Sequence, residues 1–191
     1  MEHHFIYLDQ MDVFTTPRNS WMEFGKIYFW TATIHNWEKI LFSDDFKETI
    51  TGSLRYLSEQ GLIDVFGFVI MPNHMHIIWR LNEMNGKETP SSSLLKYTAY
   101  QFKRMLPPEE LVKFKVSAVN KEYEFWQRDS LAIELFTPEV ANQKLEYIHL
   151  NPLGERWNLV DDPCDYEYSS AKFYETGESR FDFLKYVGEE F

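Results

Sequence analysis

Residues 69–81 read VIMPNHMHIIWRL, two apolar runs that meet at Pro72 and Asn73. Proline and asparagine together favour a turn, and the residues on either side are long, apolar and partly β-branched. The stretch therefore predicts two neighbouring strands, 62–71 and 74–81, joined as an antiparallel hairpin.

Two histidines, His74 and His76, interrupt the second of these apolar runs. In a strand, side chains two residues apart point to the same face, with Cα atoms about 6.5 to 7 Å apart, so two imidazoles could share one metal ion. Met75 and Ile77 would then face the opposite side, which fits an apolar, helix-covered face behind a polar one. An alternative is that the pair simply lies on an exposed strand and bonds to water.

The remaining elements follow from periodicity, capping residues and proline positions. The sequence predicts a strand over 25–34, helices over 44–60 and 91–106, an extended segment over 122–136, and a third helix over 137–151. The order strand, helix, strand, strand, helix, strand matches a split βαβ pattern. The expected fold is therefore α+β: a ferredoxin-like sandwich of a four-stranded antiparallel sheet with helices on one face, followed by one more helix.

Length and composition fit a soluble globular chain. The 191 residues are 44% hydrophobic, and no uninterrupted apolar run approaches the roughly 18 residues that a membrane span needs. The first residues lack the pattern of a secretory signal, and the single Cys164 cannot form an internal disulfide, so we expect a cytoplasmic protein. We predict an N-terminal extension (1–24), a catalytic domain (25–151) and an acidic C-terminal tail (152–191).

The third predicted helix ends in YIHLN, which places Tyr147 and Asn151 four residues apart on one helical face. The amide oxygen of Asn151 could complete a metal site, and a tyrosine hydroxyl beside a Lewis acid could act as a covalent nucleophile in phosphoryl transfer. A purely structural interpretation is also open, in which Tyr147 packs and Asn151 caps the helix before Pro152.

Taken together, MPNHMHIIW (71–79) and the later YIHLNP (147–152) resemble the motifs of the HUH single-tyrosine transposases. The continuation WNLVDDPCDYEYSSAKFY (157–174) is similar to the tail of the REP-associated tyrosine transposases. The resemblance extends from about Gly25 to Tyr174 and is specific at the two motifs.

The resemblance implies a role for each matching residue. His74, His76 and Asn151 match the ligands of a divalent cation, Mg²⁺ or Mn²⁺, and Tyr147 matches the nucleophile. The implied substrate is single-stranded DNA with hairpin ends, cut through a 5′-phosphotyrosine link without any nucleotide cofactor, in a monomer or a homodimer. Two imidazoles and an amide oxygen would by themselves suit zinc, nickel or manganese better than magnesium.

The charge pattern gives only weak guidance to a DNA surface. A formal charge of −11 argues against general attraction to nucleic acid, although residues 91–128 are locally basic, which could also be a solvated helix face. The candidate backbone contacts are Lys96, Lys103, Arg104, Gln127 and Arg128, and the candidate stacking residues are Tyr97, Tyr100, Phe102 and Trp126.

Two other functions remain open at this stage. A domesticated protein could bind DNA or RNA hairpins without cutting them, and a metal-dependent hydrolase could use the histidines without Tyr147.

Overall fold

An antiparallel sheet forms the centre of the protein. The computed structural model describes residues 20–128 and 130–191, so most of the predicted N-terminal extension lies outside the described residues. The sheet contains β1 (Ile27–Thr33), β2 (Ile63–Met71), β3 (His74–Leu81) and β6 (Leu131–Glu134), in the order β2-β3-β1-β6. All three pairings are antiparallel, and β2 and β3 form the hairpin that turns at Pro72 and Asn73.

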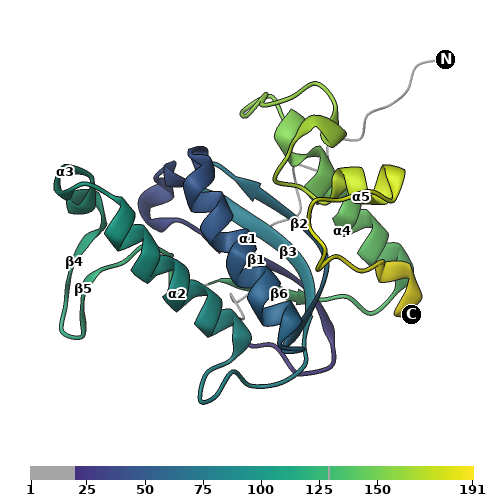
Figure 1. Ribbon diagram of the computed structural model, residues 1–191, viewed down its shortest axis with the longest axis horizontal. Coiled ribbons are helices and arrows are strands. Elements are labelled where there is room, and N and C mark those ends of the chain that lie inside the picture. The colour runs from purple at the N-terminus through teal and green to yellow at the C-terminus, as the bar shows by residue number, and fades with distance from the viewer. Residues whose placement is uncertain (1–19, 129) are drawn as a thin grey trace.

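Two helices cover one face of this sheet (Figure 1). They are α1 (Asp44–Glu59), which lies between β1 and β2, and α2 (Pro90–Met105), which follows β3. The apolar side chains of α1 recur at three- and four-residue steps, and Thr89 caps α2 by accepting a hydrogen bond from the Ser92 amide. The strand order and these crossovers confirm the predicted ferredoxin-like α+β fold. No helix in the described part of the chain is long and apolar enough to cross a membrane.

The opposite face of the sheet is covered by α4 (Pro138–Leu150). Ala141, Leu145 and Ile148 repeat at four- and three-residue steps and are buried against apolar residues of β1, β2 and β3. The two helices of the sandwich lie on one face as predicted, but the face behind them is largely apolar and not polar. The third helix buries its own apolar stripe, and it does so on the side of the sheet that carries the histidines.

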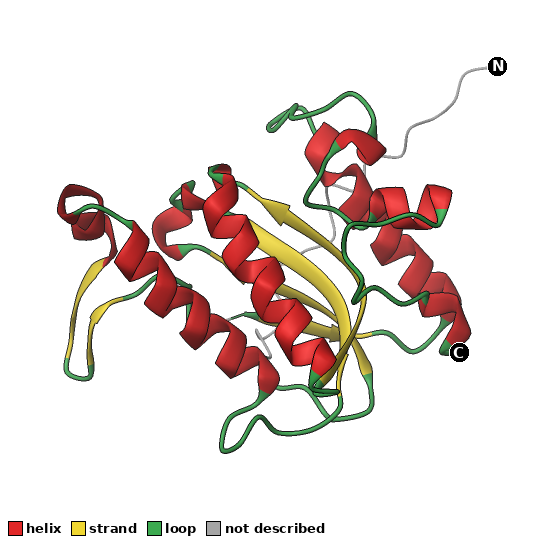
Figure 2. Cartoon of the chain, in the orientation of Figure 1, coloured by secondary structure: helices red, strands yellow, loops and turns green. Residues whose placement is uncertain are grey.

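The extended segment predicted over 122–136 is divided in two (Figure 2). A short helix, α3 (Pro108–Leu111), leads into a separate hairpin of β4 (Lys115–Ala118) and β5 (Lys121–Tyr123), and only β6 joins the main sheet. Between β5 and β6, Trp126 is buried, and its Nε1 donates a hydrogen bond to the Thr98 hydroxyl on α2 at 2.9 Å. Burying this indole against α2 is incompatible with one continuous strand.

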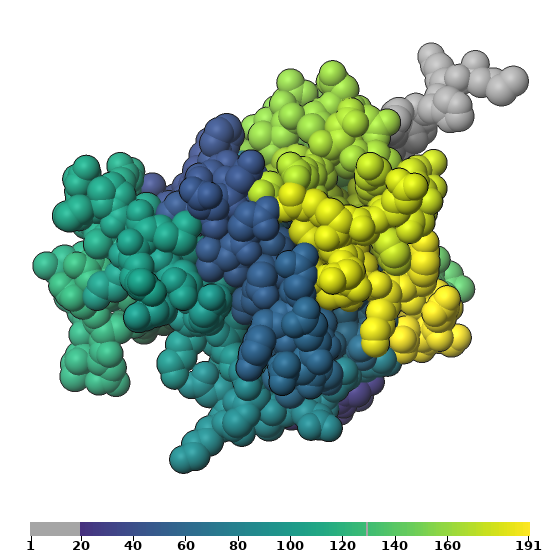
Figure 3. Space-filling view, in the orientation of Figure 1, coloured from purple at the N-terminus to yellow at the C-terminus, as the bar shows by residue number. Residues whose placement is uncertain are grey.

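The segment after α4 covers the exposed edge of β2. Backbone amides of Ser170 and Lys185 donate to the carbonyls of Phe68 and Val65 at 2.9 and 3.0 Å, and so satisfy groups that an open edge would leave unpaired. The same segment contains α5 (Ala171–Thr176) and lies against α1 on the molecular surface (Figure 3). Arg180 pairs with Glu48 of α1 there. The domain boundary predicted at residue 152 stays a prediction, but this segment packs as part of the same body.

Gly67 of β2 lies where α4 approaches the sheet most closely, beside an irregularity in the pairing with β3. A Cβ at this position would be 2.5 Å from Leu145 Cδ2 and 3.3 Å from Ile148 Cδ1. We therefore expect Gly67→Ala to lower the free energy of unfolding by about 1 to 3 kcal/mol through overpacking. Urea unfolding midpoints would measure the change.

Gly52→Ala is the matched control for Gly67→Ala. Gly52 lies inside α1, is exposed, and would place its Cβ in open space, so the same substitution should be neutral or stabilising by up to about 1 kcal/mol. Equal stability of the two variants would contradict a close contact between α4 and β2.

Candidate active site

His74 and His76 project from β3 toward α4, and their ring centroids are 4.8 Å apart. His76 is buried, with 6% of its surface exposed, and its ring stacks on Phe29 of β1 at 5.1 Å. The strand register explains this placement because β1 and β3 pair directly, so that Phe29 and the histidines share one face of the sheet.

Both imidazoles are oriented by a neighbouring polar side chain at Nδ1. Asn73 Oδ1 lies 2.8 Å from His74 Nδ1, and the Asn73 amide nitrogen donates to the Trp37 carbonyl at 3.2 Å. Since that amide nitrogen is occupied, Asn73 presents its oxygen to His74, which must donate from Nδ1 and keep Nε2 unprotonated. Thr31 Oγ1 lies 2.7 Å from His76 Nδ1, and this hydroxyl can either donate or accept. The tautomer in which Nδ1 donates leaves Nε2 of each ring available as a ligand.

The electrostatic surroundings keep both histidines neutral at pH 7. Burial lowers the pKa of His74 to about 4, the charge of Arg156 acts in the same direction, and a hydrogen bond to Asn151 opposes them. Burial also holds the pKa of His76 well below 6.5, with smaller contributions from His74 and Lys144. A neutral imidazole is the form that binds a metal ion, so the site needs no deprotonation before binding.

Helix α4 brings Tyr147 and Asn151 to these histidines. The Tyr147 ring is 5.4 Å from the His76 ring and 6.0 Å from Phe29, and half of the residue surface is exposed. The Asn151 amide nitrogen donates to the Tyr147 carbonyl at 3.0 Å, so the amide oxygen is the atom that faces His74. All four residues come from one chain, so the arrangement does not require a second copy.

The donor set of this site fits a divalent cation. Two imidazoles and one amide oxygen, a donor set that suits a divalent transition metal, lie together beside the half-exposed Tyr147. In the described ranges there is no cluster of three or more His, Cys, Asp or Glu residues that could hold a metal ion. A metal at this position would therefore depend on Asn151 as its third protein ligand.

Sequence reasoning missed several residues around the histidines. Thr31 is opposite His76 in the β1–β3 register, but the sequence does not determine that register. Lys144 is three residues before Tyr147, a helical spacing that could have identified it. Its ammonium lies 5.1 Å from the centre of the Phe29 ring and 5.7 Å from that of Tyr147. Trp157, 6.0 Å from His74 between ring centroids, comes from a turn that has no sequence signature.

The candidate DNA contacts on α2 lie on the other side of the sheet from the histidines. Lys96 pairs with Glu88 at 2.5 Å, Lys103 approaches Glu122 at 3.9 Å, and Arg104 lies over the Tyr100 ring. Of the candidate stacking residues, Tyr97 and Tyr100 are exposed, whereas Phe102 and Trp126 are core residues and cannot stack on bases.

Gln127 and Arg128 lie nearer the histidines than the α2 candidates do. The Gln127 amide donates to the carbonyl of Thr33, the residue paired with His74, and Arg128 pairs with Glu124 at 3.2 Å. A role in DNA binding for any of the five polar candidates stays a prediction.

His149 faces away from the candidate site, as expected from its position on the helix. Its Nε2 lies 2.8 Å from the Ser170 hydroxyl, and burial lowers its pKa from 6.5 to about 4. As the pH falls below 6.5, the unfolded chain binds a proton at this residue before the folded chain does. The neutral state of His149 therefore makes its full contribution to the free energy of unfolding above pH 6.5, and this contribution is lost as the pH falls toward 4.

We expect His149→Gln to reduce this acid sensitivity while the amide maintains a hydrogen bond to Ser170. Between pH 7.5 and pH 5, the wild type should lose about 2 kcal/mol more unfolding free energy than the variant. The contributions of His74 and His76 are common to both proteins and cancel in this comparison. Urea titrations at both pH values measure the difference, and parallel losses would show that His149 is not held neutral.

These observations define a class of structure: a four-stranded ferredoxin-like sheet whose histidine pair faces a helix that carries a tyrosine. The fold is shared with a solved REP-associated tyrosine transposase, determined bound to a REP hairpin. That match has a TM-score of 0.59 and 18% sequence identity, and it covers 90% of this chain and 93% of the other.

A second similar structure is a protein from Deinococcus radiodurans that is provisionally named a transposase. The TM-score is 0.39 and the identity 13%, over 70% of this chain and 95% of the other. No family model matches the chain, and no curated protein sequence matches it.

Proposed function

We propose that this protein is an HUH single-tyrosine transposase, similar to the REP-associated group, that nicks and rejoins single-stranded DNA near hairpins. The observation that carries the proposal is the contact between Tyr147 and the histidine pair, with 5.4 Å between the ring centroids of Tyr147 and His76. The shared fold supports it, since the site occurs on a sheet of the same architecture.

The proposed reaction transfers one phosphodiester to the enzyme. The Tyr147 hydroxyl oxygen attacks the phosphorus, an oxygen–phosphorus bond forms, and the bond to the 3′-oxygen breaks. The phenol loses a proton and the leaving 3′-oxygen gains one, so the products are a 5′-phosphotyrosine and a free 3′-hydroxyl. Attack by a 3′-hydroxyl reverses the step and joins strands, which is why no nucleotide cofactor is required.

The chain's own residues supply alignment for this reaction. Phe29 supports the His76 ring, Asn73 and Thr31 fix the two imidazoles, and half-exposed Tyr147 can reach a strand in solvent. A divalent cation held by His74, His76 and Asn151 would supply neutralisation of phosphate charge. The donor set favours Mn²⁺ over Mg²⁺ in binding strength.

End-labelled DNA tests which side of the cut becomes attached to the protein. Single-stranded oligonucleotides from the flanking genomic sequence, each with a hairpin, would be incubated with the protein and Mn²⁺. A label at the 3′ end should remain on the protein through a denaturing gel, and a 5′ label should be released on a fragment that a polymerase can extend. If no flanking strand yields an adduct, a hairpin-binding protein that does not cut becomes the better description.

A further inference from the structure

The positive charges beside the histidines form no ion pair with a carboxylate of the described residues. Most lysines and arginines in residues 20–128 and 130–191 pair with a carboxylate, including Lys96, Lys103 and Arg128. No carboxylate lies within ion-pair distance of Lys39, Lys144 or Arg156 in that described part. In a chain with a charge of −11, three unpaired cations at one site are an unusual local feature.

Two of these cations are held on the His74 side of the site by one aromatic ring. The Lys39 ammonium lies 5.5 Å and the Arg156 guanidinium 5.2 Å from the centre of the Trp157 ring, which is itself 6.0 Å from His74. A cation over an aromatic face is attracted to it but keeps its hydrogen-bond donors for another group. Both residues are exposed, so an anionic ligand can reach them.

The third cation lies on the His76 side. Lys144 extends over the rings of Phe29 and Tyr147 and is partly buried, which lowers its pKa. Arg156 and Lys144 each act on one histidine, since Arg156 lowers the pKa of His74 and Lys144 that of His76. The charges therefore flank the histidine pair on two sides, with Tyr147 next to Lys144.

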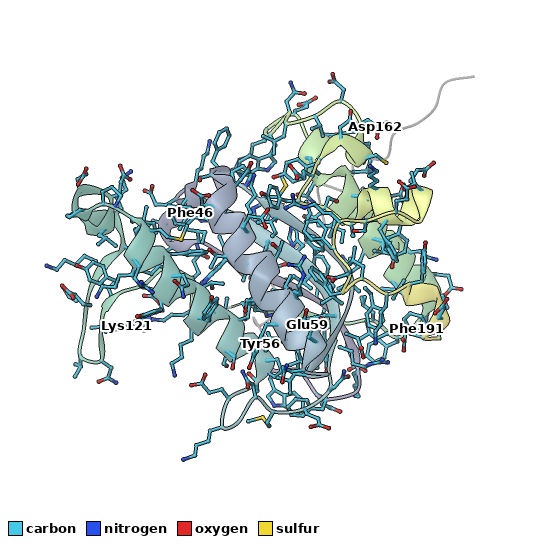
Figure 4. All side chains as sticks on the ribbon, in the orientation of Figure 1. Phe46, Tyr56, Glu59, Lys121, Asp162 and Phe191 are labelled. Atoms are coloured by element: carbon cyan, nitrogen blue, oxygen red, sulfur yellow. The ribbon has the colours of Figure 1, made fainter. Side chains whose placement is uncertain are left out.

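We propose that Lys144 on one side, and Lys39 with Arg156 on the other, bind phosphates of single-stranded DNA on either side of the bond to be cut. This assignment rests on the proposed nicking function for the identity of the central phosphate. It places the strand across α4 and the turn after it, and not on α2. In Figure 4, Lys121 marks the β4–β5 hairpin, which contacts α2 through Lys103, and Asp162 marks the segment that follows the turn after α4; the two labels lie on different sides of the view.

Binding measured without chemistry tests the proposal. In the Tyr147→Phe background and without divalent metal, fluorescence anisotropy would follow a labelled oligothymidylate over a range of salt concentrations. Each of Lys39→Gln, Lys144→Gln and Arg156→Gln should weaken binding about 3- to 10-fold and lower the slope of log affinity against log salt by about 0.7. The partly buried Lys144 should show the largest loss, and Lys144→Arg should restore most of it.

The controls remove equal charge elsewhere. Lys115→Gln on β4 and Lys172→Gln on α5 take away exposed lysines that pair with no carboxylate of the described residues, and should change affinity less than 2-fold. Equal losses in the control and site variants would overturn the proposal, as would a parent protein that does not bind the oligonucleotide. Urea midpoints close to that of the parent would show that the variants are folded.

The outcome for the phosphate contacts is separable from that for nicking. Loss of binding in the three site variants, with no covalent adduct on any DNA, would support the strand path and contradict the nicking proposal. Adduct formation with unchanged binding in all three variants would support nicking and contradict the strand path.

Discussion

Tyr147→Phe is expected to abolish covalent capture of DNA while leaving the fold and DNA affinity nearly unchanged. The substitution removes one hydroxyl and preserves the ring that packs against Phe29 and His76. No hydrogen bond of that hydroxyl occurs in the described part of the chain, so unfolding free energy should change by less than about 0.5 kcal/mol. The rate of adduct formation should fall by on the order of 10³-fold or more, because the bond-forming atom is absent.

Tyr56→Phe provides a control of the same chemistry. Tyr56 of α1 is 54% exposed and Tyr147 is 50% exposed, but of these two only Tyr147 contacts the histidines. The Tyr56 variant should form adducts at the wild-type rate. Denaturing gels of both variants, with peptide mapping of the wild-type adduct, measure the outcome.

Two results would contradict this assignment in different ways. An adduct that persists in Tyr147→Phe would show that another residue is the nucleophile. Cleavage at the wild-type rate by that variant, without any adduct, would favour a hydrolase that uses the histidines to activate water and does not need Tyr147.

The main sheet was predictable because its signals are local. Pro72 and Asn73 mark the turn of the β2–β3 hairpin, and the apolar spacing of α1 and the Thr137-Pro138 start of α4 define those helices closely. The division of 122–136 was not predictable, since it depends on the burial of Trp126 against α2, a contact between residues 28 apart. Charge composition likewise suggested an acidic tail and gave no sign that it would pair with β2.

The candidate site, like the fold, could be predicted from the sequence where its signals are local. The spacing of His74 and His76 within a strand, and of Tyr147 and Asn151 within a helix, is fixed by backbone geometry, so each pair could be recognised from sequence. The meeting of the two pairs in one site, which the resemblance implies, depends on α4 packing over the histidine face through its apolar stripe. The orienting residue Thr31 becomes visible only from the pairing register of β1 with β3.

Alanine substitution of the two histidines is expected to have the second large effect, on metal affinity and on adduct formation. His74→Ala and His76→Ala should each lower divalent-metal affinity by on the order of 10²-fold or more and abolish adduct formation. Strand binding without metal should be retained, because it depends on phosphate charge and not on the imidazoles. Calorimetric titration with Mn²⁺ would measure the first effect, and anisotropy with a labelled hairpin strand would measure the second.

The two histidine variants should differ in stability, which helps to separate metal loss from unfolding. His76 is 6% exposed and stacks on Phe29, so His76→Ala leaves a cavity and should cost about 1 to 3 kcal/mol. His74 is less buried and should cost less. His149→Gln is the control, because this partly buried histidine on α4 contacts Ser170 and lies outside the site, so its substitution should leave metal binding and adduct formation intact.

Asn151→Leu extends the same test to the third ligand. The side chain is close in volume but has no amide oxygen, so metal affinity should fall by on the order of 10-fold or more, with the hydrogen bond to the Tyr147 carbonyl also lost. Asn151→Asp, which keeps an oxygen donor and adds charge, should retain metal binding. Wild-type cutting by the His74→Ala/His76→Ala double variant in chelator-treated buffer would refute the metal role, because neither imidazole nor free cation would then be needed for the chemistry.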